Sequence, residues 1–330
     1  MKTPAYHKSL ETLHVNCLEP RAYFIPFADE KTAASRERSE SDYFVPLCGE
    51  WDFRFFKSFE DVLREPPEYV GEGGFDKIAV PRSWQTYTDR GYDVPLYSNL
   101  EYPFPTDPPF VPDENPCGLY VRKFTLDEKL SLRDLFLNFE GVDSCFYVWL
   151  NGKFVGFSEV SHCTSEFDVT DFAVSGENTL CVLVVKWCPG TYLEDQDCFR
   201  FSGIFREVYL LARGKERLDD IFVKSYISDD FNSAELRIEA KLSTPCDIKY
   251  KLVAPNGAVV SEGVGGEKFS ISVDSPVLWN DEQPELYELW LTVGDEIVLL
   301  DTAVRRFEIK DGICLLNGKA VKARGINRHD

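Results

Sequence analysis

The feature that most constrains the fold of this chain is a set of short segments in which apolar and polar residues alternate. Residues 235–242 place leucine, isoleucine, alanine and leucine on one face, and two glutamates, an arginine and a lysine on the other. Residues 287–293 alternate in the same way. A period of two residues is typical of a β-strand with one face in a core and the other in solvent. Since no helical period separates the segments, we expect an all-β protein.

The strand-like segments fall into two groups, and each group predicts a β-sandwich. Over residues 44–213 they are rich in β-branched and aromatic residues, are broken by Pro, Gly and Asn, and include the hairpin signal Asn151-Gly152. This pattern favours a jelly-roll sandwich. Over residues 214–308, about seven segments within roughly 95 residues favour an immunoglobulin-like sandwich. The length of 330 residues also exceeds what a single core comfortably fills.

Two terminal segments stand outside these groups. Residues 1–43 are polar and irregular, which is typical of an arm that either forms a mobile tail or docks on another subunit. Residues 309–330 carry a second hairpin signal at Asn317-Gly318 and then begin a further strand. No partner domain for that strand remains in the sequence, so we expect the chain to be the front portion of a larger protein.

Charge and cysteine content narrow the classes of partner. The net charge of −20 repels phosphate backbones and anionic lipid, so we expect neither nucleic acid nor a membrane as a partner. No segment reaches transmembrane length and the N-terminus has no apolar signal-peptide core, so we expect a cytoplasmic protein with reduced thiols. The ten cysteines have no CxxC spacing and there are four histidines, which disfavours a tetrahedral zinc site.

Two polar clusters are candidates for a binding site. Residues 192–207 hold several acids, a glutamine and two arginines. The carboxylates there either cap turns and pair with the arginines, or reach a sugar hydroxyl or a cation. Residues 97–103 hold Asn99, whose amide has the donors and acceptor that polyol recognition needs. The alternative for this second cluster is a Pro-rich loop whose aromatic residues simply pack on the sandwich. No nucleophile–base pair and no Gly-rich phosphate loop is visible in the sequence.

From about residue 44 to its end, the chain resembles the N-terminal part of the cytosolic β-galactosidases of glycoside hydrolase family 2. The block EDQDxxRxSGIFR is specific, and the β-glucuronidases of the family carry a different pattern there, which favours the galactosidase branch. The first 43 residues match weakly. The resemblance rests on SWQ (83–85), VPLYSNLEYP (94–103), PPFVPDENPCGLY (108–120), VWLNGKFVGFS (148–158), YLEDQDCFRFSGIFREVYLL (192–211), LWNDEQPELY (278–287) and LLNGKAVKARGINRHD (315–330).

The resemblance implies an architecture of a jelly-roll sugar-binding domain, an immunoglobulin-like domain and a TIM barrel. Residues 309–330 would then be a hairpin and the start of a truncated barrel. It further implies that Asn99 reaches the galactose subsite, and that Asp197 contacts the galactose 6-hydroxyl and a bound sodium ion. Both catalytic glutamates and the magnesium ligands would come from the missing barrel, so no catalytic residue is expected in this chain.

The parent protein is therefore expected to hydrolyse terminal non-reducing β-D-galactose residues with retention of configuration, as a homo-oligomer that uses magnesium and sodium. These 330 residues alone are expected to be inactive and to bind sugar weakly. The alternative is a stand-alone carbohydrate-binding β-sandwich protein without catalysis.

Overall fold

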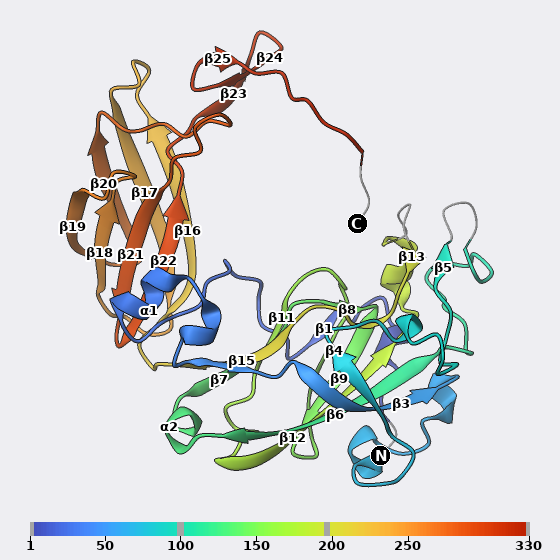
Figure 1. Cartoon of the computed structure of the whole chain (residues 1–330). Helices are drawn as coiled ribbons and strands as arrows, with labels where there is room; N and C mark the ends of the chain where they lie inside the picture. The colour runs from blue at the N-terminus through green and yellow to red at the C-terminus, as the bar shows by residue number, and fades with distance from the viewer. Residues whose placement is uncertain (1–2, 98–101, 195–198, 328–330) are drawn as a thin grey trace. The chain divides into compact units, whose positions relative to one another are not determined.

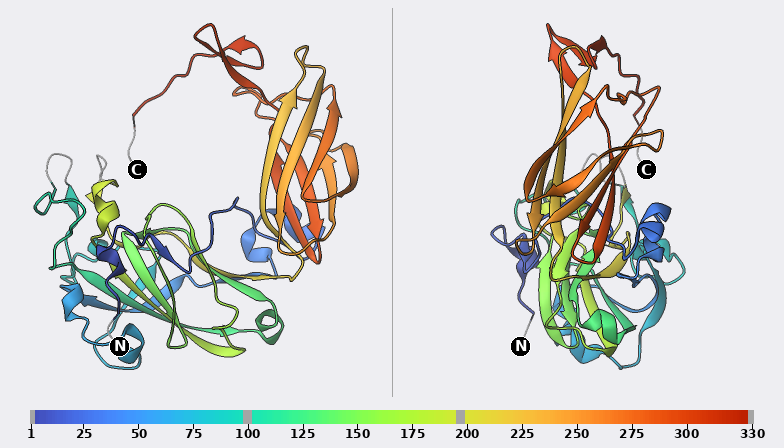
Figure 2. Two further views of the ribbon diagram at one scale, coloured as in Figure 1. Left: turned by 180° about the vertical axis from the view of Figure 1, so that it is seen from behind. Right: turned by 90° about the vertical axis from the view of Figure 1, so that its left-hand side faces the viewer.

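The computed structural model of the chain describes residues 3–97, 102–194 and 199–327. Strands dominate these residues (Figures 1 and 2), and the all-β prediction is confirmed. The described helices are short. They are α1 (Glu30–Ser35), α2 (Glu128–Ser131) and the 3₁₀ turns η1 (Tyr6–Lys8), η2 (Arg38–Glu40), η3 (Phe59–Asp61), η4 (Pro66–Tyr69), η5 (Trp84–Thr86) and η6 (Pro189–Tyr192).

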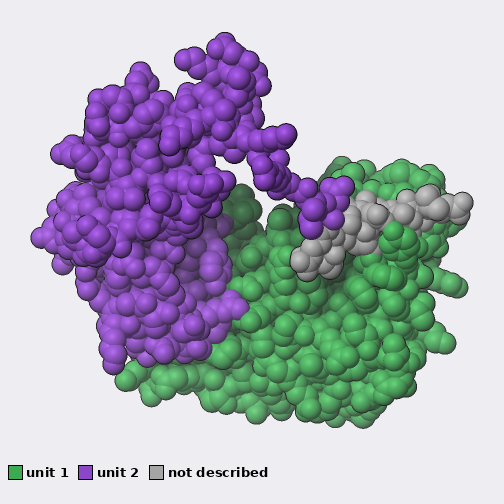
Figure 3. Space-filling model, turned by 45° about the horizontal axis from the view of Figure 1, so that its top comes forward, with its two compact units in different colours: residues 1–20, 45–212, 328–330 green, residues 21–44, 213–327 purple. Residues whose placement is uncertain are grey.

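The chain divides into two compact units, coloured separately in Figure 3. Unit 1 contains the described residues of 1–20 and 45–212, and unit 2 contains residues 21–44 and 213–327. The first 44 residues are thus shared between the units rather than forming one separate arm. Each unit has its own hydrophobic core.

Unit 1 is built on a seven-stranded antiparallel sheet and a four-stranded sheet. The seven-stranded sheet has the order β1 (His14–Val15), β10 (Lys153–Ser158), β9 (Cys145–Leu150), β12 (Gly176–Val185), β6 (Cys117–Leu126), β3 (Gly49–Phe56) and β4 (Asp76–Val80). The four-stranded sheet has the order β11 (Ser165–Asp168), β7 (Asp134–Phe139), β15 (Val208–Arg213) and β2 (Phe44–Pro46). Two short ladders pair β5 (Leu96–Tyr97) with β13 (Phe199–Arg200), and β8 (Val142–Asp143) with β14 (Gly203–Ile204).

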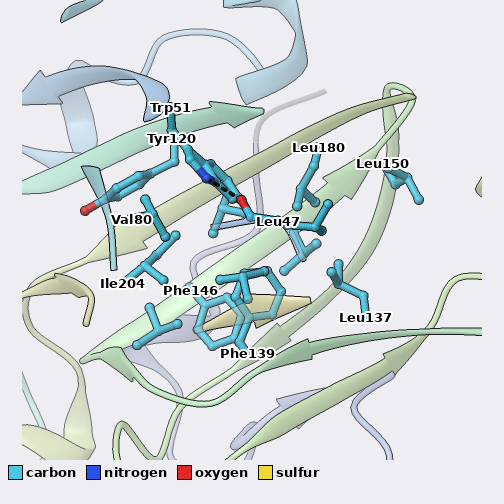
Figure 4. Packing of buried hydrophobic residues seen from close by; sticks show 14 of the residues in the cluster. Leu47, Trp51, Val80, Tyr120, Leu137, Phe139, Phe146, Leu150, Leu180 and Ile204 are labelled. Carbon is cyan, nitrogen blue, oxygen red and sulfur yellow. Dashed lines mark hydrogen bonds between the residues drawn. The ribbon is translucent and has the colours of Figure 1, made fainter. Parts of the chain in front are cut away.

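Both faces of the seven-stranded sheet are buried, which explains why its central strands read as continuous apolar runs. In β9, Phe146 and Val148 join one core cluster, and Tyr147 and Trp149 join another. Figure 4 shows part of the first cluster, where the indole Nε1 of Trp51 donates a hydrogen bond of 2.8 Å to a backbone oxygen. A strand covered on both sides has no solvent face, so the two-residue alternation disappears from its sequence.

The N-terminal segment helps to cover the second face of this sheet. Strand β1 pairs with β10, and Nδ1 of the buried His7 lies 2.9 Å from the Tyr147 hydroxyl. Lys8 forms a 2.7 Å ion pair with Asp113. Residues 3–20 are therefore a structural part of unit 1.

Gly156, in β10, allows the N-terminal segment to approach closely. A Cβ atom at this position would overlap the backbone oxygen of Val15 and lie 2.7 Å from the Phe167 ring. We expect Gly156→Ala to lower the free energy of unfolding of unit 1 by about 1–3 kcal/mol, because β1 must shift. Urea denaturation measures this loss. Gly73→Ala is the control, since no atom lies within 4 Å of that position; equal losses in both variants would contradict the close approach.

Unit 2 contains two further antiparallel sheets. One has the order β16 (Leu218–Ile227), β17 (Ser233–Leu242) and β20 (Lys268–Asp274), and the other β19 (Val259–Gly265), β18 (Ile248–Val253), β21 (Tyr287–Val293) and β22 (Glu296–Thr302). In β17, Leu236 and Ile238 are buried in the core, whereas Arg237 and Glu239 are exposed. The alternation predicted from the sequence is confirmed at these positions.

A small three-stranded sheet follows in unit 2, with β23 (Phe307–Lys310), β24 (Ile313–Leu316) and β25 (Lys319–Ala320). Asn317 and Gly318 join the last two strands with φ values of 50° and 75°, and Asn151 and Gly152 join β9 and β10 with 51° and 79°. Two successive residues with positive φ are what a type I′ hairpin turn requires.

Candidate functional site

Asn99 and Asp197, the two residues assigned to sugar binding, lie in the segments 98–101 and 195–198, outside the described residues. The residues that flank these segments are described. Tyr97 pairs with Phe199 in the ladder of β5 and β13, and their ring centroids lie 5.5 Å apart. The ladder therefore brings one end of each segment together, although residues 97 and 199 are far apart in the sequence.

The segment after β13 is fixed by the turn that contains Trp84 and Gln85. The backbone N–H of Ser202 donates to Oε1 of Gln85 at 2.9 Å, and Nε2 of Gln85 lies 3.2 Å from the Ser202 hydroxyl. The backbone N–H of Trp84 donates to the backbone oxygen of Ser202 at 3.1 Å. Gln85 and Ser202 are both buried, so water does not compete for these hydrogen bonds, which fix the backbone shortly after β13.

A buried ion pair joins the same network. Nζ of Lys186, which is 3% exposed, lies 2.6 Å from Oδ2 of Asp93. Nε2 of Gln85 donates to the same oxygen at 3.1 Å. Asp93 lies near the start of the loop that leads to β5, and Lys186 follows β12. The network thus connects both candidate loops to the sheet.

Aromatic residues of the Pro-rich loop pack against the residues around η6. The rings of Phe104 and Trp187 have centroids 5.1 Å apart, as do those of Tyr102 and Tyr192. The Tyr102 hydroxyl donates to the backbone oxygen of Tyr192 at 2.7 Å. The packing role considered for these aromatics is therefore present, while Phe199, at 57% exposure, remains open to solvent.

The two arginines of residues 192–207 contact backbone oxygens. Nη2 of Arg200 donates to the backbone oxygen of Thr191 at 3.3 Å, and the guanidinium carbon of Arg200 lies 5.9 Å from the Trp187 ring centroid. Nη1 of Arg206 donates to the backbone oxygen of His162 at 3.0 Å. These contacts hold the described segments on either side of residues 195–198.

Two carboxyl groups that sequence reasoning missed, those of Asp143 and Glu159, lie close enough to the carboxyl group of Glu194 to be affected by its charge. Burial and then the charge of Glu194 raise the pKa of Asp143 to about 7. The same two causes, in the same order, raise the pKa of Glu159 to about 8. The available signal was an acid directly after an apolar residue or at a strand end, which is common in sequences. Within the described ranges, no group of three or more His, Cys, Asp or Glu side chains is placed to hold a metal ion.

Comparison with known proteins identifies the family. A model described as "Glycosyl hydrolases family 2, sugar binding domain" matches residues 44–214, and one described as "Glycosyl hydrolases family 2" matches residues 216–309. The first model alone covers more than half of the chain. The chain belongs to glycosyl hydrolase family 2, and the resemblance read from the sequence is confirmed.

The chain is similar to curated proteins named beta-galactosidase. It is 46% identical over 331 residues to that of Actinobacillus pleuropneumoniae, with all of this chain covered, and 40% identical over 336 residues to that of Staphylococcus xylosus, with 98% covered. In both cases the match covers 32% of the relative. The chain therefore spans about a third of the length of these relatives.

Solved structures share the fold. A beta-glucuronidase from an uncultured Clostridium matches with a TM-score of 0.67 and 24% identity, over 84% of this chain and 47% of that chain. The Ruminococcus gnavus enzyme in complex with D-glucaro-d-lactam matches with a TM-score of 0.68 and 18% identity, over 85% and 49%. At these identities the likeness concerns the fold alone. None of the helices in the described part of the chain has the length and apolar character to cross a lipid bilayer.

Proposed function

We propose that the chain is the N-terminal portion of a retaining β-galactosidase, which hydrolyses terminal β-D-galactose residues. The proposal rests mainly on the 46% identity to a protein named beta-galactosidase over the whole chain. Its domains are a jelly-roll sugar-binding domain (44–213), an immunoglobulin-like domain (214–308) and the entry to a TIM barrel (309–330), and the residues 1–43 expected to form an arm are instead divided between the two units. The limits of the two family models support the two central domains.

In this proposal the chain supplies one border of the sugar site. Asn99 hydrogen-bonds galactose, and Asp197 accepts a hydrogen bond from the 6-hydroxyl and binds sodium. The pairing of Tyr97 with Phe199 supports this assignment, because it brings together the strands next to both residues. Carboxylate and amide oxygens suit both a hydroxyl donor and a hard cation.

The chemistry belongs to the remaining part of the protein in this proposal. A barrel supplies the acid, the nucleophile and the magnesium ligands, and the whole protein is a homo-oligomer. We also place it in the cytoplasm, which the free thiols of the nine described cysteines support. The residues of this chain orient the sugar and exclude water around it.

The test is a chromogenic assay on the full-length protein and its Asp197→Ala variant. Losing a hydrogen bond to a charged group costs about 1.5–3 kcal/mol, so we expect about a 10- to 100-fold loss of kcat/KM and a weaker response to sodium. Asn99→Ala should lose less, since a neutral partner is removed. An unchanged Asp197→Ala enzyme would refute the assignment of this residue.

Two further arms of the assay test the function itself. We expect the full-length protein to hydrolyse a β-galactoside and not the matching β-glucuronide, and the 330 residues alone to hydrolyse neither. Turnover of the glucuronide would refute the substrate. Micromolar galactose binding by the 330 residues, measured by calorimetry, would support the alternative of a stand-alone carbohydrate-binding protein.

A further inference from the structure

His7 holds the N-terminal segment, residues 3–20, on unit 1 through a side chain that is completely buried. The residue lies in η1, is 0% exposed, and its ring centroid lies 4.3 Å from that of Phe59 in η3. Two of its nitrogens face one oxygen. The backbone N–H donates to the Tyr147 hydroxyl at 3.2 Å, and Nδ1 lies 2.9 Å from the same oxygen. Tyr147 is also buried, so this contact is shielded from solvent.

The hydrogen bonds determine which ring nitrogen of His7 carries the proton. The Tyr147 oxygen already accepts from the backbone N–H, so its own hydrogen has Nδ1 as its acceptor, and Nδ1 is the unprotonated nitrogen. Nε2 then carries the ring proton, and this atom is buried without a hydrogen-bond partner. A second proton on Nδ1 would turn the acceptor into a donor and leave the hydroxyl hydrogen of Tyr147 without a partner in the interior.

The charges around His7 also oppose a second proton. Lys8 follows it in η1, and the ammonium group of Lys8 pairs with Asp113 at 2.7 Å. Burial, and then the charge of Lys8, lower the pKa of His7 from its ordinary 6.5 to about 3. Tyr147 stays neutral, because burial and then the neighbouring Cys145 raise the pKa of its hydroxyl. The docked segment therefore holds His7 as the neutral imidazole.

We propose that His7 is a pH switch, which keeps the N-terminal segment docked on unit 1 while it is neutral and releases the segment when acid protonates it. Release moves the imidazole from a site that has no place for a second proton into water, where it is readily protonated. Because docking lowers the pKa of His7, its contribution to docking is fully present above 6.5 and is lost progressively as the pH falls from there toward about 3. The proposal concerns the segment alone and does not depend on the proposed hydrolysis.

The expected size of the effect follows from the two pKa values. With a pKa of about 3 in the docked state and 6.5 in the released state, the equilibrium constant for release should rise about 20- to 25-fold from pH 7 to pH 5. A docked value one unit higher changes this factor little, because both values of about 3 and about 4 lie below pH 5.

Two nearby carboxyl groups do not produce a loss in this range. Lys8 lowers the pKa of Asp113, so the contribution of that carboxylate declines only below its ordinary 3.8. The charge of Glu159 acts on Tyr147, but the pKa of Glu159 is raised to about 8. Its contribution is therefore present at low pH and is lost as the pH rises, which is the opposite direction.

His14 is a second histidine of the segment, and its effect must be separated from that of His7. Its Nδ1 lies 3.0 Å from the Ser158 hydroxyl, and partial burial lowers its pKa while the charge of Glu19 opposes the shift. The experiment therefore uses the His14→Asn chain, in which His7 is the titrating histidine that remains in the segment.

Hydrogen exchange of the 330-residue chain at pH 7 and pH 5, corrected for the intrinsic pH dependence of exchange, tests the proposal. The backbone N–H of Glu159 donates to the Leu13 oxygen at 3.0 Å, and that of Ser9 donates to the Tyr6 oxygen at 2.8 Å, so both amides lose protection when the segment leaves. In His14→Asn their protection should fall about 20- to 25-fold from pH 7 to pH 5. Amides of β12, which pairs with β6 and β9, and of unit 2, whose described residues include no histidine, should keep theirs.

Variants of His7 in the same background identify the titrating group. His7→Asn keeps an oxygen that can accept from the Tyr147 hydroxyl but does not titrate, so the change with pH should shrink to less than about twofold. His7→Phe keeps a ring against Phe59 and should show the same small change, which covers the case that the smaller amide docks too weakly for protection to be measured. A 20-fold loss in these double variants, unchanged protection in His14→Asn, or an equal loss in β12 would overturn the proposal.

Discussion

Replacing Glu296 with alanine is expected to lower the free energy of unfolding of unit 2 by about 3–5 kcal/mol. The side chains of Arg213 and Glu296 are 3% and 1% exposed and meet at 2.8 Å. Glu296 also accepts from Nε of Arg213 at 2.9 Å and from the backbone N–H of Gly214 at 2.6 Å. Removing the carboxylate leaves the buried guanidinium without its charge partner and the Gly214 N–H without its acceptor, and these two losses account for the large effect.

The size of this effect is checked by urea denaturation against an exposed pair of the same length. Arg237 and Glu235 also meet at 2.8 Å, but their side chains are 53% and 37% exposed. Glu235→Ala should therefore cost less than about 1 kcal/mol. The double variant Arg213→Met, Glu296→Leu should be more stable than Glu296→Ala, because no unpaired charge remains. Equal losses in Glu296→Ala and Glu235→Ala would contradict the role given to burial.

Lys186→Met should destabilise unit 1 by a comparable amount, about 3–5 kcal/mol. The ammonium group of Lys186 forms an ion pair with the carboxylate of Asp93, whose side chain is 15% exposed. Gln85 links this ion pair by hydrogen bonds to Ser202. Without Lys186 the carboxylate keeps the Gln85 amide as a hydrogen-bond donor but loses its charge partner. The bonds that position the segment after β13 should then loosen.

Two measurements separate this local effect from a general loss of stability. Urea denaturation gives the free energy, with Lys123→Met as control, since the Lys123–Glu177 pair is exposed. Hydrogen exchange at the Ser202 N–H, which donates to Gln85, reports the network directly. Unchanged exchange at Ser202 in Lys186→Met would contradict the link between the ion pair and the candidate site.

The parts of the fold that follow local rules could be predicted from the sequence. The alternation in β17 predicted which side chains are buried, because one face of that strand meets the core and the other meets water. The family followed from the quoted segments, including EDQDxxRxSGIFR. Each of these signals depends on residues that are neighbours in the sequence.

Contacts between distant residues could not be predicted in this way. Asp93 and Lys186 are 93 positions apart, and nothing near either of them in the sequence indicates that they meet. The burial of Glu159 could not be predicted either. An acid at a strand end is usually solvated, and Glu159 is buried only because other segments pack around it. The roles of Asn99 and Asp197 depend on family resemblance, while the structure adds the pairing of the strands beside them.

The distribution of the first 44 residues over both units has a consequence for folding during synthesis. His7 contacts Tyr147, which follows 140 positions later, and Arg36 contacts Asp301, which follows 265 positions later. Translation must therefore pass residue 147 before His7 can reach its partner, and residue 301 before Arg36 can reach its own. Contacts over such distances form slowly, and unpaired strands exposed in the meantime favour association between nascent chains. Both segments are thus made well before the partners that hold them in place, which gives chaperones an interval in which to act on them.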